Sequence, residues 1–384
     1  MIAFLATFLR LTANTFFGAS GTPGSLTVRR ALVMLLLLPV FLLVQCVNWL
    51  CLLLDEGLFP GYHLVEIRRP VFVIGAPRSG TTMLHRVLSA DAQFTTAAAW
   101  ELWLAPSILQ RKLIGTCVGA DRAIGRPLAR LVHWGERKLS GDFNEIHPVS
   151  LSAPEEDYFM LVPAWGCFIL VLAFPNCREL WDLAFFDERV PEARREYLLR
   201  FYHESVQRHL YVHGPDKTYL NKNPSFTSWV DSLSQTFPDA RFAACVRSPA
   251  SVLPSLLSSM SGGHAFFDND CSGPYFCDHF EEILAHYYHC IGENLPACGC
   301  NQETVEMREL TKDLEQTIIR IYEALELPVS EDFKAHVAEQ AAANRAYTSG
   351  HRYTLEDFGL EHEAIVKQFD WAYERFGFSR EKPG

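Results

Sequence analysis

The chain has 384 residues, 49% of them hydrophobic, and a formal net charge of −11. This length suits one large α/β domain, or two smaller ones, with additional segments. The acidic balance argues against a general nucleic-acid-binding protein, which would carry a basic face, so any anionic ligand must be bound by a local cluster of cations.

The first element in chain order is an uncharged segment, residues 31–54, composed mostly of Leu, Val and Phe. A helix of this length, rising about 1.5 Å per residue, would cover the hydrocarbon core of a bilayer, which is about 30 Å thick. We therefore expect a transmembrane helix, preceded by a short N-terminal segment (1–30) and followed by a connector (55–69). A signal peptide and a buried core helix are the competing interpretations.

The charges that flank this segment predict its orientation. Arg29 and Arg30 precede it, and Asp55 and Glu56 follow it. The positive-inside rule then places the N-terminus in the cytosol and the main domain in a lumen, Golgi-like in a eukaryotic cell. Residues 2–17 could instead form an interfacial helix, which would leave a membrane-associated domain facing the cytosol.

Residues 71–82 predict a strand, a tight loop and a helix. Gly75 and Gly80 have the spacing of a phosphate-binding loop, in which backbone N–H groups and a helix N-terminus converge on an anion. In nucleoside triphosphatases the second glycine is followed by a lysine and then by a magnesium-binding hydroxyl. Here Thr81 takes the place of the lysine, and Arg78 is the only cation of the loop. The loop therefore predicts an anion site that differs from that of an ATPase.

Several acids and one histidine are candidates for a general base. Glu101 lies between two tryptophans about twenty residues after the loop, where it could return to the pocket, although a surface glutamate on an amphipathic helix is the competing interpretation. His147 and the Glu155–Glu156 pair are rivals. The acids at 155–157 also fit an ordinary helix start, because acids favour the first turn. The basic residues scattered through 105–145 predict a solvated helical face.

The second half of the chain repeats the arrangement of strand, cation and helix. Residues 241–246 predict a buried strand that ends at Arg247, and Ser248 with Pro249 then begins a helix. Ligands of open α/β sheets bind at the carboxyl ends of the strands, so Arg78 and Arg247 can share a pocket. Ser255 lies about two helical turns beyond Arg247 and can face the same anion.

The remaining pattern predicts a three-layer α/β fold. Further strands are expected near residues 219–223 and 303–310, with helices between them and a helical tail over 355–378. Such alternation is typical of a central, mostly parallel sheet flanked by helices, which we expect as one P-loop-like domain over residues 70–380.

Two of these motifs together resemble a known family. Residues 77–82, Pro-Arg-Ser-Gly-Thr-Thr, and Arg247 with Ser255 are similar to the donor-binding signatures of sulfotransferases that use 3′-phosphoadenosine 5′-phosphosulfate (PAPS). The segments 154–157, 220–224 and 351–360 resemble further landmarks of a large branch of that family. The similarity extends over about residues 68 to 380.

The resemblance implies roles for individual residues and for a co-substrate. Five loop residues would hold the 5′-phosphosulfate of PAPS: Arg78, Ser79, Gly80, Thr81 and Thr82. Arg247 and Ser255 would hold the 3′-phosphate, Lys222 would contact the donor, and His351 and Arg352 would close over it. Glu101 would be the base, as in Golgi sulfotransferases with a glutamate shortly after the loop. No metal is expected, because a transferring sulfuryl group carries less negative charge than a phosphoryl group.

The acceptor stays open at this stage, since a carbohydrate, lipid, small alcohol or protein would each offer a hydroxyl or amine. Two other functions also remain open. A P-loop kinase or NTPase is disfavoured by the missing lysine, and a membrane-anchored, non-catalytic binding protein is disfavoured by the complete set of donor-site residues.

Overall fold

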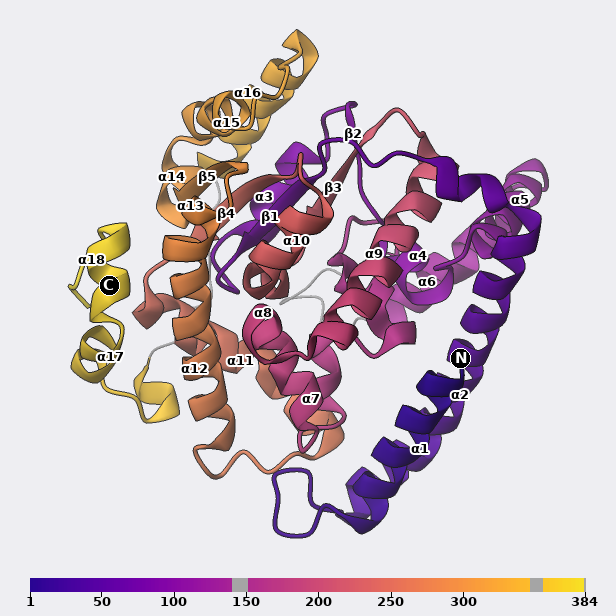
Figure 1. The fold of residues 1–384 in the computed structure, drawn as a ribbon, viewed down its shortest axis with the longest axis horizontal. Helices are drawn as coiled ribbons and strands as arrows, with labels where there is room; N and C mark the ends of the chain where they lie inside the picture. The colour runs from indigo at the N-terminus through magenta and orange to yellow at the C-terminus, as the bar shows by residue number, and fades with distance from the viewer. Residues whose placement is uncertain (140–150, 346–354, 383–384) are drawn as a thin grey trace.

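The computed structural model describes residues 1–139, 151–345 and 355–382. Its centre is a five-stranded parallel sheet in the order β2-β3-β1-β4-β5 (Figure 1). The strands are β1 (Val71–Gly75), β2 (Phe94–Thr95), β3 (Thr218–Lys222), β4 (Arg241–Val246) and β5 (Asn301–Glu306). Parallel strands with helical connections form the α/β fold that the sequence predicts.

Side chains of β1 alternate between two cores, as the pleat of a strand requires. Phe72 and Ile74 belong to the larger hydrophobic cluster, whereas Val71 and Val73 belong to the smaller one. The helices α3 (Thr81–Leu88), α15 (Leu314–Ala324) and α16 (Glu331–Arg345) supply side chains to the smaller cluster.

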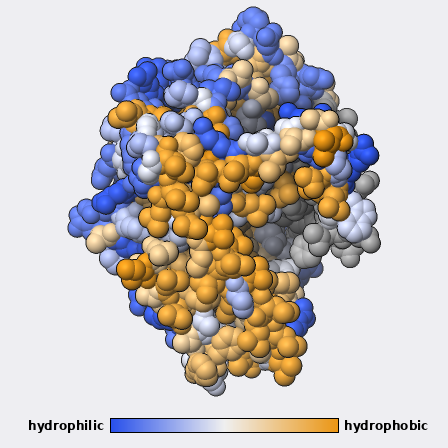
Figure 2. All heavy atoms as spheres, turned by 90° about the vertical axis from the view of Figure 1, so that its right-hand side faces the viewer, coloured by the Kyte–Doolittle hydropathy of each residue, from blue (hydrophilic) through white to orange (hydrophobic). Residues whose placement is uncertain are grey.

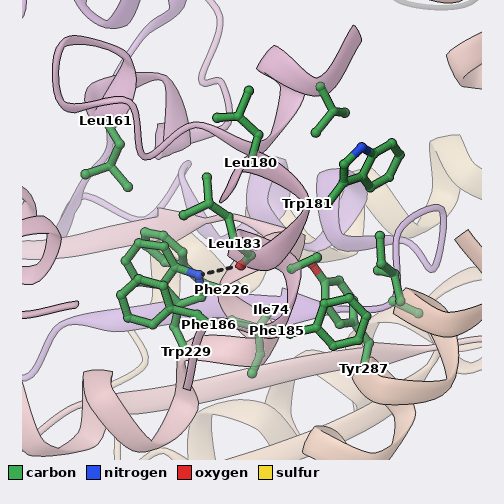
Figure 3. Packing of buried hydrophobic residues seen from close by; sticks show 14 of the residues in the cluster. Ile74, Leu161, Leu180, Trp181, Leu183, Phe185, Phe186, Phe226, Trp229 and Tyr287 are labelled. Carbon is green, nitrogen blue, oxygen red and sulfur yellow. Dashed lines mark hydrogen bonds between the residues drawn. The ribbon is translucent and has the colours of Figure 1, made fainter. Parts of the chain in front are cut away.

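The larger cluster involves most of the remaining helices. They are α7 (Arg178–Trp181), α8 (Phe186–Arg189), α9 (Glu192–His213), α10 (Val230–Thr236), α11 (Pro249–Phe267), α12 (Tyr275–His289), α17 (His362–Gln368) and α18 (Asp370–Phe376). Within it, the rings of Phe186 and Trp229 stack with centroids 3.4 Å apart, and the Trp229 indole donates to the Leu183 carbonyl (Figure 3). The sheet is therefore covered on both faces.

The N-terminal region forms a helical hairpin along one side of the domain (Figure 1). Helix α1 is Ile2–Phe17, and α2 is Val28–Leu58. In the described part of the chain, α2 alone is long and apolar enough to cross a membrane, judged by length and composition. One stripe of α2 is buried against the domain, including Arg30, Asn48 and Asp55.

Four further helices lie near the site or the hairpin: α4 (Ala99–Leu104), α5 (Ile108–Ala123), α6 (Pro127–Leu139) and α14 (Met307–Lys312). Helix α14 corrects the sequence prediction of a strand over 303–310, because β5 ends at Glu306 and the chain turns directly into this helix. The Glu309 carboxylate accepts from the backbone N–H of Glu306 and so caps α14. Sequence periodicity does not separate a short strand from a capped turn that follows it at once.

Candidate active site

The loop after β1 lies at the carboxyl end of the middle strand and is fixed by close backbone contacts. A Cβ on Gly75 would lie 2.2 Å from the carbonyl oxygen of Cys245 in β4, so only glycine fits there. The buried Ser79 hydroxyl lies 2.8 Å from the same carbonyl and 2.5 Å from that of Ala76. The hydroxyl of Ser79 therefore stabilises the loop from within.

The loop backbone prepares a helix N-terminus for an anion. Gly80 has φ of 98° and is the N-cap of α3, and Arg78 takes a left-handed φ of 64°. Left-handed backbone is uncommon for a residue with a side chain and is concentrated at functional sites. The first N–H groups of α3 have no partner within the helix, so they can donate to a bound anion.

Arg78, Arg247 and Ser255 come together at this loop. The Arg78 Nε donates to Ser255 Oγ at 3.1 Å, and an Arg247 Nη lies 3.4 Å from the Arg78 carbonyl oxygen. The carbonyl of Arg247 accepts from the buried Tyr288 hydroxyl, which fixes the backbone at this point. The three residues are therefore in contact at the edge of the sheet where the sequence predicts them.

The two guanidinium groups form a local excess of positive charge. Over residues 1–139, 151–345 and 355–382, no carboxylate lies within ion-pair distance of Arg78 or Arg247. Burial first, and the neighbouring charge of Arg78 second, lower the pKa of Arg247. In a chain with net charge −11, two adjacent arginines without a carboxylate partner among the described residues favour the binding of an anion.

Lys222 lies one strand away, at the end of β3. It is in register with Val73 of β1, and its ammonium group pairs with Glu156 at 2.6 Å. Next to it, the buried carboxyl of Asp157 accepts from Asn221 and from the hydroxyls of Tyr202 and Tyr219. Burial raises the pKa of Asp157 to about 6, although these donors act against the rise.

Glu101 lies in α4, just beyond the carboxyl end of β2, in a buried cluster. Its carboxylate pairs with His213 Nε2 at 2.5 Å and with Arg111 Nε at 3.5 Å, and it accepts from the Ala98 N–H at 3.0 Å. Burial raises the pKa of Glu101, but Arg111 and His213 together outweigh it and lower the pKa below the ordinary range. The Glu101 carboxylate is therefore ionised and held by these three donors.

The residues around Glu101 were not identified from the sequence. His209 and His213 are separated by one helical turn of α9, and this i, i+4 spacing was the available signal. Nitrogen atoms of both rings and a Glu101 oxygen lie within 4.8 Å of one another, which is metal-ligand spacing. The Arg111 guanidinium already supplies positive charge to this carboxylate, which opposes a cation there.

Other predicted residues have different surroundings. Glu155 lies beside the segment before α4, because its N–H donates to Ala97 O, and its own carboxylate accepts from the Glu156 N–H. Thr81 is buried and Thr82 is exposed at the start of α3. His147, His351 and Arg352 fall outside the described residues.

These features are typical of one class of protein: a parallel α/β enzyme whose central loop, helix N-terminus and arginines can bind a phosphate- or sulfate-bearing group. A sequence model of the sulfotransferase family matches residues 70–331. The chain therefore belongs to the sulfotransferase family, and it is an enzyme that transfers a sulfuryl group. This assignment takes the place of the kinase and the non-catalytic alternatives.

Individual relatives are consistent with this assignment. The chain is 24% identical over 334 residues to the omega-hydroxy-beta-dihydromenaquinone-9 sulfotransferase Stf3 of Mycobacterium bovis, a match that covers 82% of this chain and 76% of the relative.

Two solved structures share the fold. Sulfotransferase STF9 from Mycobacterium avium has a TM-score of 0.67 at 19% identity, over 85% of this chain and 81% of that one. Sulfotransferase STF1 from Mycobacterium tuberculosis has a TM-score of 0.64 at 22% identity, over 95% and 91%.

Proposed function

We propose that this enzyme transfers the sulfuryl group of PAPS to the hydroxyl of a lipid acceptor. The observation that carries the donor assignment is the cluster of Arg78, Ser255 and Arg247, two unpaired cations and a hydroxyl beside a helix N-terminus. PAPS carries negative charge at two ends of an adenosine, and this site offers a backbone cradle at one end and a second arginine at the other.

Within this proposal, the loop residues bind the 5′-phosphosulfate. The N–H groups at the start of α3 and the Arg78 guanidinium contact it, with Gly80, Thr81 and Thr82 contributing backbone or hydroxyl donors. Ser79 contributes only through its backbone, because its hydroxyl is bound to carbonyl oxygens. Arg247 and Ser255 bind the 3′-phosphate. His351 and Arg352 stay predicted donor contacts.

Lys222 has the position for a contact with the sulfuryl group. It lies on the strand next to β1, and its side chain is only 5% exposed and pairs with Glu156. When an anion enters, Lys222 can share its protons between the sulfuryl oxygens and Glu156. We expect no metal ion at this step, since arginine, lysine and backbone donors supply the positive charge.

For the base we propose Glu101. The start of α4 is hydrogen-bonded to the segment that carries Glu156, and Glu156 pairs with Lys222 at the carboxyl end of β3. The acceptor oxygen forms the new bond to sulfur, adenosine 3′,5′-bisphosphate leaves, and Glu101 receives the acceptor's proton with half-exposed His213 beside it.

Glu101→Gln tests the base. General bases contribute about 10²- to 10⁴-fold, so kcat should fall by that amount while the affinity for adenosine 3′,5′-bisphosphate changes little. Glu155→Gln tests the rival base in parallel, and we expect little change in its kcat because the Glu155 carboxylate is bound by a neighbouring backbone N–H. Unchanged turnover of Glu101→Gln together with loss in Glu155→Gln would transfer the role to Glu155. Loss in neither variant would leave His147 as the predicted base.

The lipid acceptor and the membrane location are supported by separate observations. The relative's name specifies omega-hydroxy-beta-dihydromenaquinone-9, a lipid with a hydroxyl group, and this chain carries the long apolar helix α2. We propose that the enzyme works at a membrane, where a lipid hydroxyl reaches the carboxyl edge of the sheet. A single-pass arrangement with a lumenal domain over residues 70–380 is the sequence prediction for this attachment.

Calorimetric titration with adenosine 3′,5′-bisphosphate, and with ATP and magnesium, tests the donor assignment. We expect tight binding of the bisphosphate without metal and much weaker binding of ATP. Preference for ATP with magnesium would contradict the proposal.

A further inference from the structure

The outer surface of the N-terminal hairpin is largely apolar, with Arg10, Asn14 and Arg29 among its exposed polar residues. Figure 2 shows this face as an extended hydrophobic region on the side of the molecule where α1 and α2 lie. Between residues 31 and 54, every exposed side chain of α2 is Leu, Val or Pro. They are Leu32, Leu35, Leu36, Pro39, Val40, Leu43, Val47, Leu50, Leu53 and Leu54. A continuous apolar surface of this kind marks an interaction site.

The opposite stripe of α2 is joined to the domain near the N-terminal end of the helix. The buried Arg30 guanidinium donates to the carbonyls of Phe267 and Ala173 and to the side chain of Asn269, at 2.6 to 2.9 Å. These partners belong to the segments after α11 and before α7, so this end of α2 is bound to the catalytic domain.

The C-terminal end of α2 is joined to the same domain. The buried Asp55 carboxylate accepts from the N–H groups of Ile108 and Leu109 at the start of α5, and it lies 3.4 Å from Arg208 of α9. Between the two ends, the Trp49 indole donates to the Pro163 carbonyl at 3.1 Å. The domain therefore contacts α2 along its length.

These contacts decide between crossing a membrane and lying along it. Arg30 and Asp55 are 25 residues apart, which is about 38 Å of helix, more than the roughly 30 Å of hydrocarbon core. If α2 crossed the bilayer, the domain groups bound at one end would have to lie on the opposite side from those bound at the other. Both ends belong to one domain, so α2 can cross only if these buried polar contacts break.

The charges around this face favour an anionic surface as its partner. Residues 1–54 contain three arginines but no Asp or Glu. Arg10 pairs with Glu179 and Arg30 is buried, so Arg29 is the cation of this segment that is left for a partner. Helix α5 packs against α2, and residues 104–135 carry five basic residues against one acid, Asp121. The Asp121 carboxylate is buried and accepts from N–H groups at the start of α6.

The exposed residues of α5, of α6 and of the turn between them mix positive charge with apolar side chains. The cations are Lys112, Arg122, Arg126 and Arg130, and the apolar residues are Leu113, Val118, Ile124, Leu128, Leu131 and Val132. In a chain of net charge −11 this is a strong local exception. Helices with exposed Lys or Arg beside apolar side chains are typical of proteins that lie in the headgroup region of anionic bilayers.

We propose that α1, α2, α5 and α6 form a monotopic docking face: the helices lie in one leaflet of an anionic membrane, α2 runs parallel to the surface, and both ends of α2 stay on the same side. This inference builds on the proposed membrane location and replaces the single span. It does not depend on sulfuryl transfer.

Vesicle flotation of the full chain tests the docking face. Phosphatidylcholine vesicles with and without phosphatidylglycerol are the two probes. We expect Leu36→Glu combined with Leu43→Glu to reduce the bound fraction about tenfold or more, since both side chains are exposed and the fold does not need them. Ile319→Glu, at an exposed apolar position on α15, is the matched control and should bind as wild type. Arg122→Gln with Arg130→Gln should weaken binding to the anionic vesicles only.

Three results would overturn this docking face. Wild-type binding to neither vesicle overturns the membrane location itself. Binding that is equal for neutral and anionic vesicles overturns the electrostatic part. A stable dimer in sedimentation velocity that Leu36→Glu with Leu43→Glu converts to monomer, with no vesicle binding, assigns the face to a second copy. Each result leaves the donor-site titrations unaffected, so failure here is separable from failure of the proposed reaction.

Cysteine labelling in sealed vesicles from expressing cells tests the flat arrangement. Ser20 and Gly57 are exposed near the two ends of α2, and a side chain on Gly57 meets nothing within 4 Å. Ser20→Cys and Gly57→Cys are made separately in a background with the exposed Cys117 and Cys271 changed to serine. A membrane-impermeant maleimide should label both positions or neither in vesicles of one orientation. Labelling of one position in each orientation would show a span and overturn the proposal.

Discussion

Removing the Arg247 side chain should weaken donor binding only through the 3′-phosphate. Arg247 has no carboxylate partner among the described residues, so Arg247→Ala leaves no buried acid unpaired. It also removes a cation beside Arg78 whose pKa burial already lowers. We therefore expect the thermal stability of the variant to stay near that of wild type.

The expected loss follows from the chemistry of the contact. A hydrogen bond to a charged group is worth about 1.5 to 3 kcal/mol, so Kd for adenosine 3′,5′-bisphosphate should rise by about 10- to 150-fold. Adenosine 5′-monophosphate lacks the 3′-phosphate, and its Kd should change by less than about threefold. The difference between the two ligands isolates the contribution of one phosphate.

Isothermal titration of both ligands against both proteins measures this difference. Arg68→Ala is the matched control, because Arg68 is exposed and pairs only with Glu66 at 2.5 Å. An equal loss of affinity for the two ligands would refute the assignment of Arg247 to the 3′-phosphate.

Two further predictions concern the loop and its helix. Gly75→Ala should abolish folding or lower the free energy of unfolding by more than about 3 kcal/mol, because the new Cβ would lie 2.2 Å from the Cys245 carbonyl oxygen. A Cβ on Gly57 meets nothing within 4 Å, so the control Gly57→Ala should be neutral or stabilising. A thermal melt of Gly75→Ala like that of wild type would contradict this prediction. Burial, and then nearby positive charge, lower the pKa of His85 to about 3, below the unfolded value of 6.5. As the pH falls, the unfolded chain therefore binds this proton before the folded chain does, so the free energy of unfolding decreases below pH 6.5. Between pH 7.5 and 5.5, this decrease should be smaller by about 1.4 kcal/mol in His85→Gln than in wild type, as measured by denaturant titrations. An unchanged slope would show that His85 does not titrate on unfolding.

Local sequence signals were sufficient for the central strands and for the donor cluster. The run of β-branched and aromatic residues into Gly75 gave β1, and residues 241–246 are the observed β4. The contact between Arg78 and Ser255 followed from the two helix starts and from the rule that ligands gather at the carboxyl ends of parallel strands.

Partners that are distant in sequence could not be read in the same way. Arg111 and His213, which hold Glu101, come from two different helices, and nothing local to either residue indicates their meeting. The hydrophobicity of residues 31–54 gave a long apolar helix correctly, but composition does not reveal that Asp55 caps α5. Tertiary contacts therefore determine how α2 relates to a membrane, and the sequence alone does not.

The most direct test of the reaction uses PAPS labelled with ³⁵S, lipid vesicles that contain a total lipid extract of the source cells, and the full chain. We predict that wild-type enzyme moves the label into the organic-soluble fraction without added metal, and that Arg78→Ala does not. Label that stays entirely in PAPS and inorganic sulfate with wild type, or equal transfer by Arg78→Ala, would contradict sulfuryl transfer to a lipid at this loop.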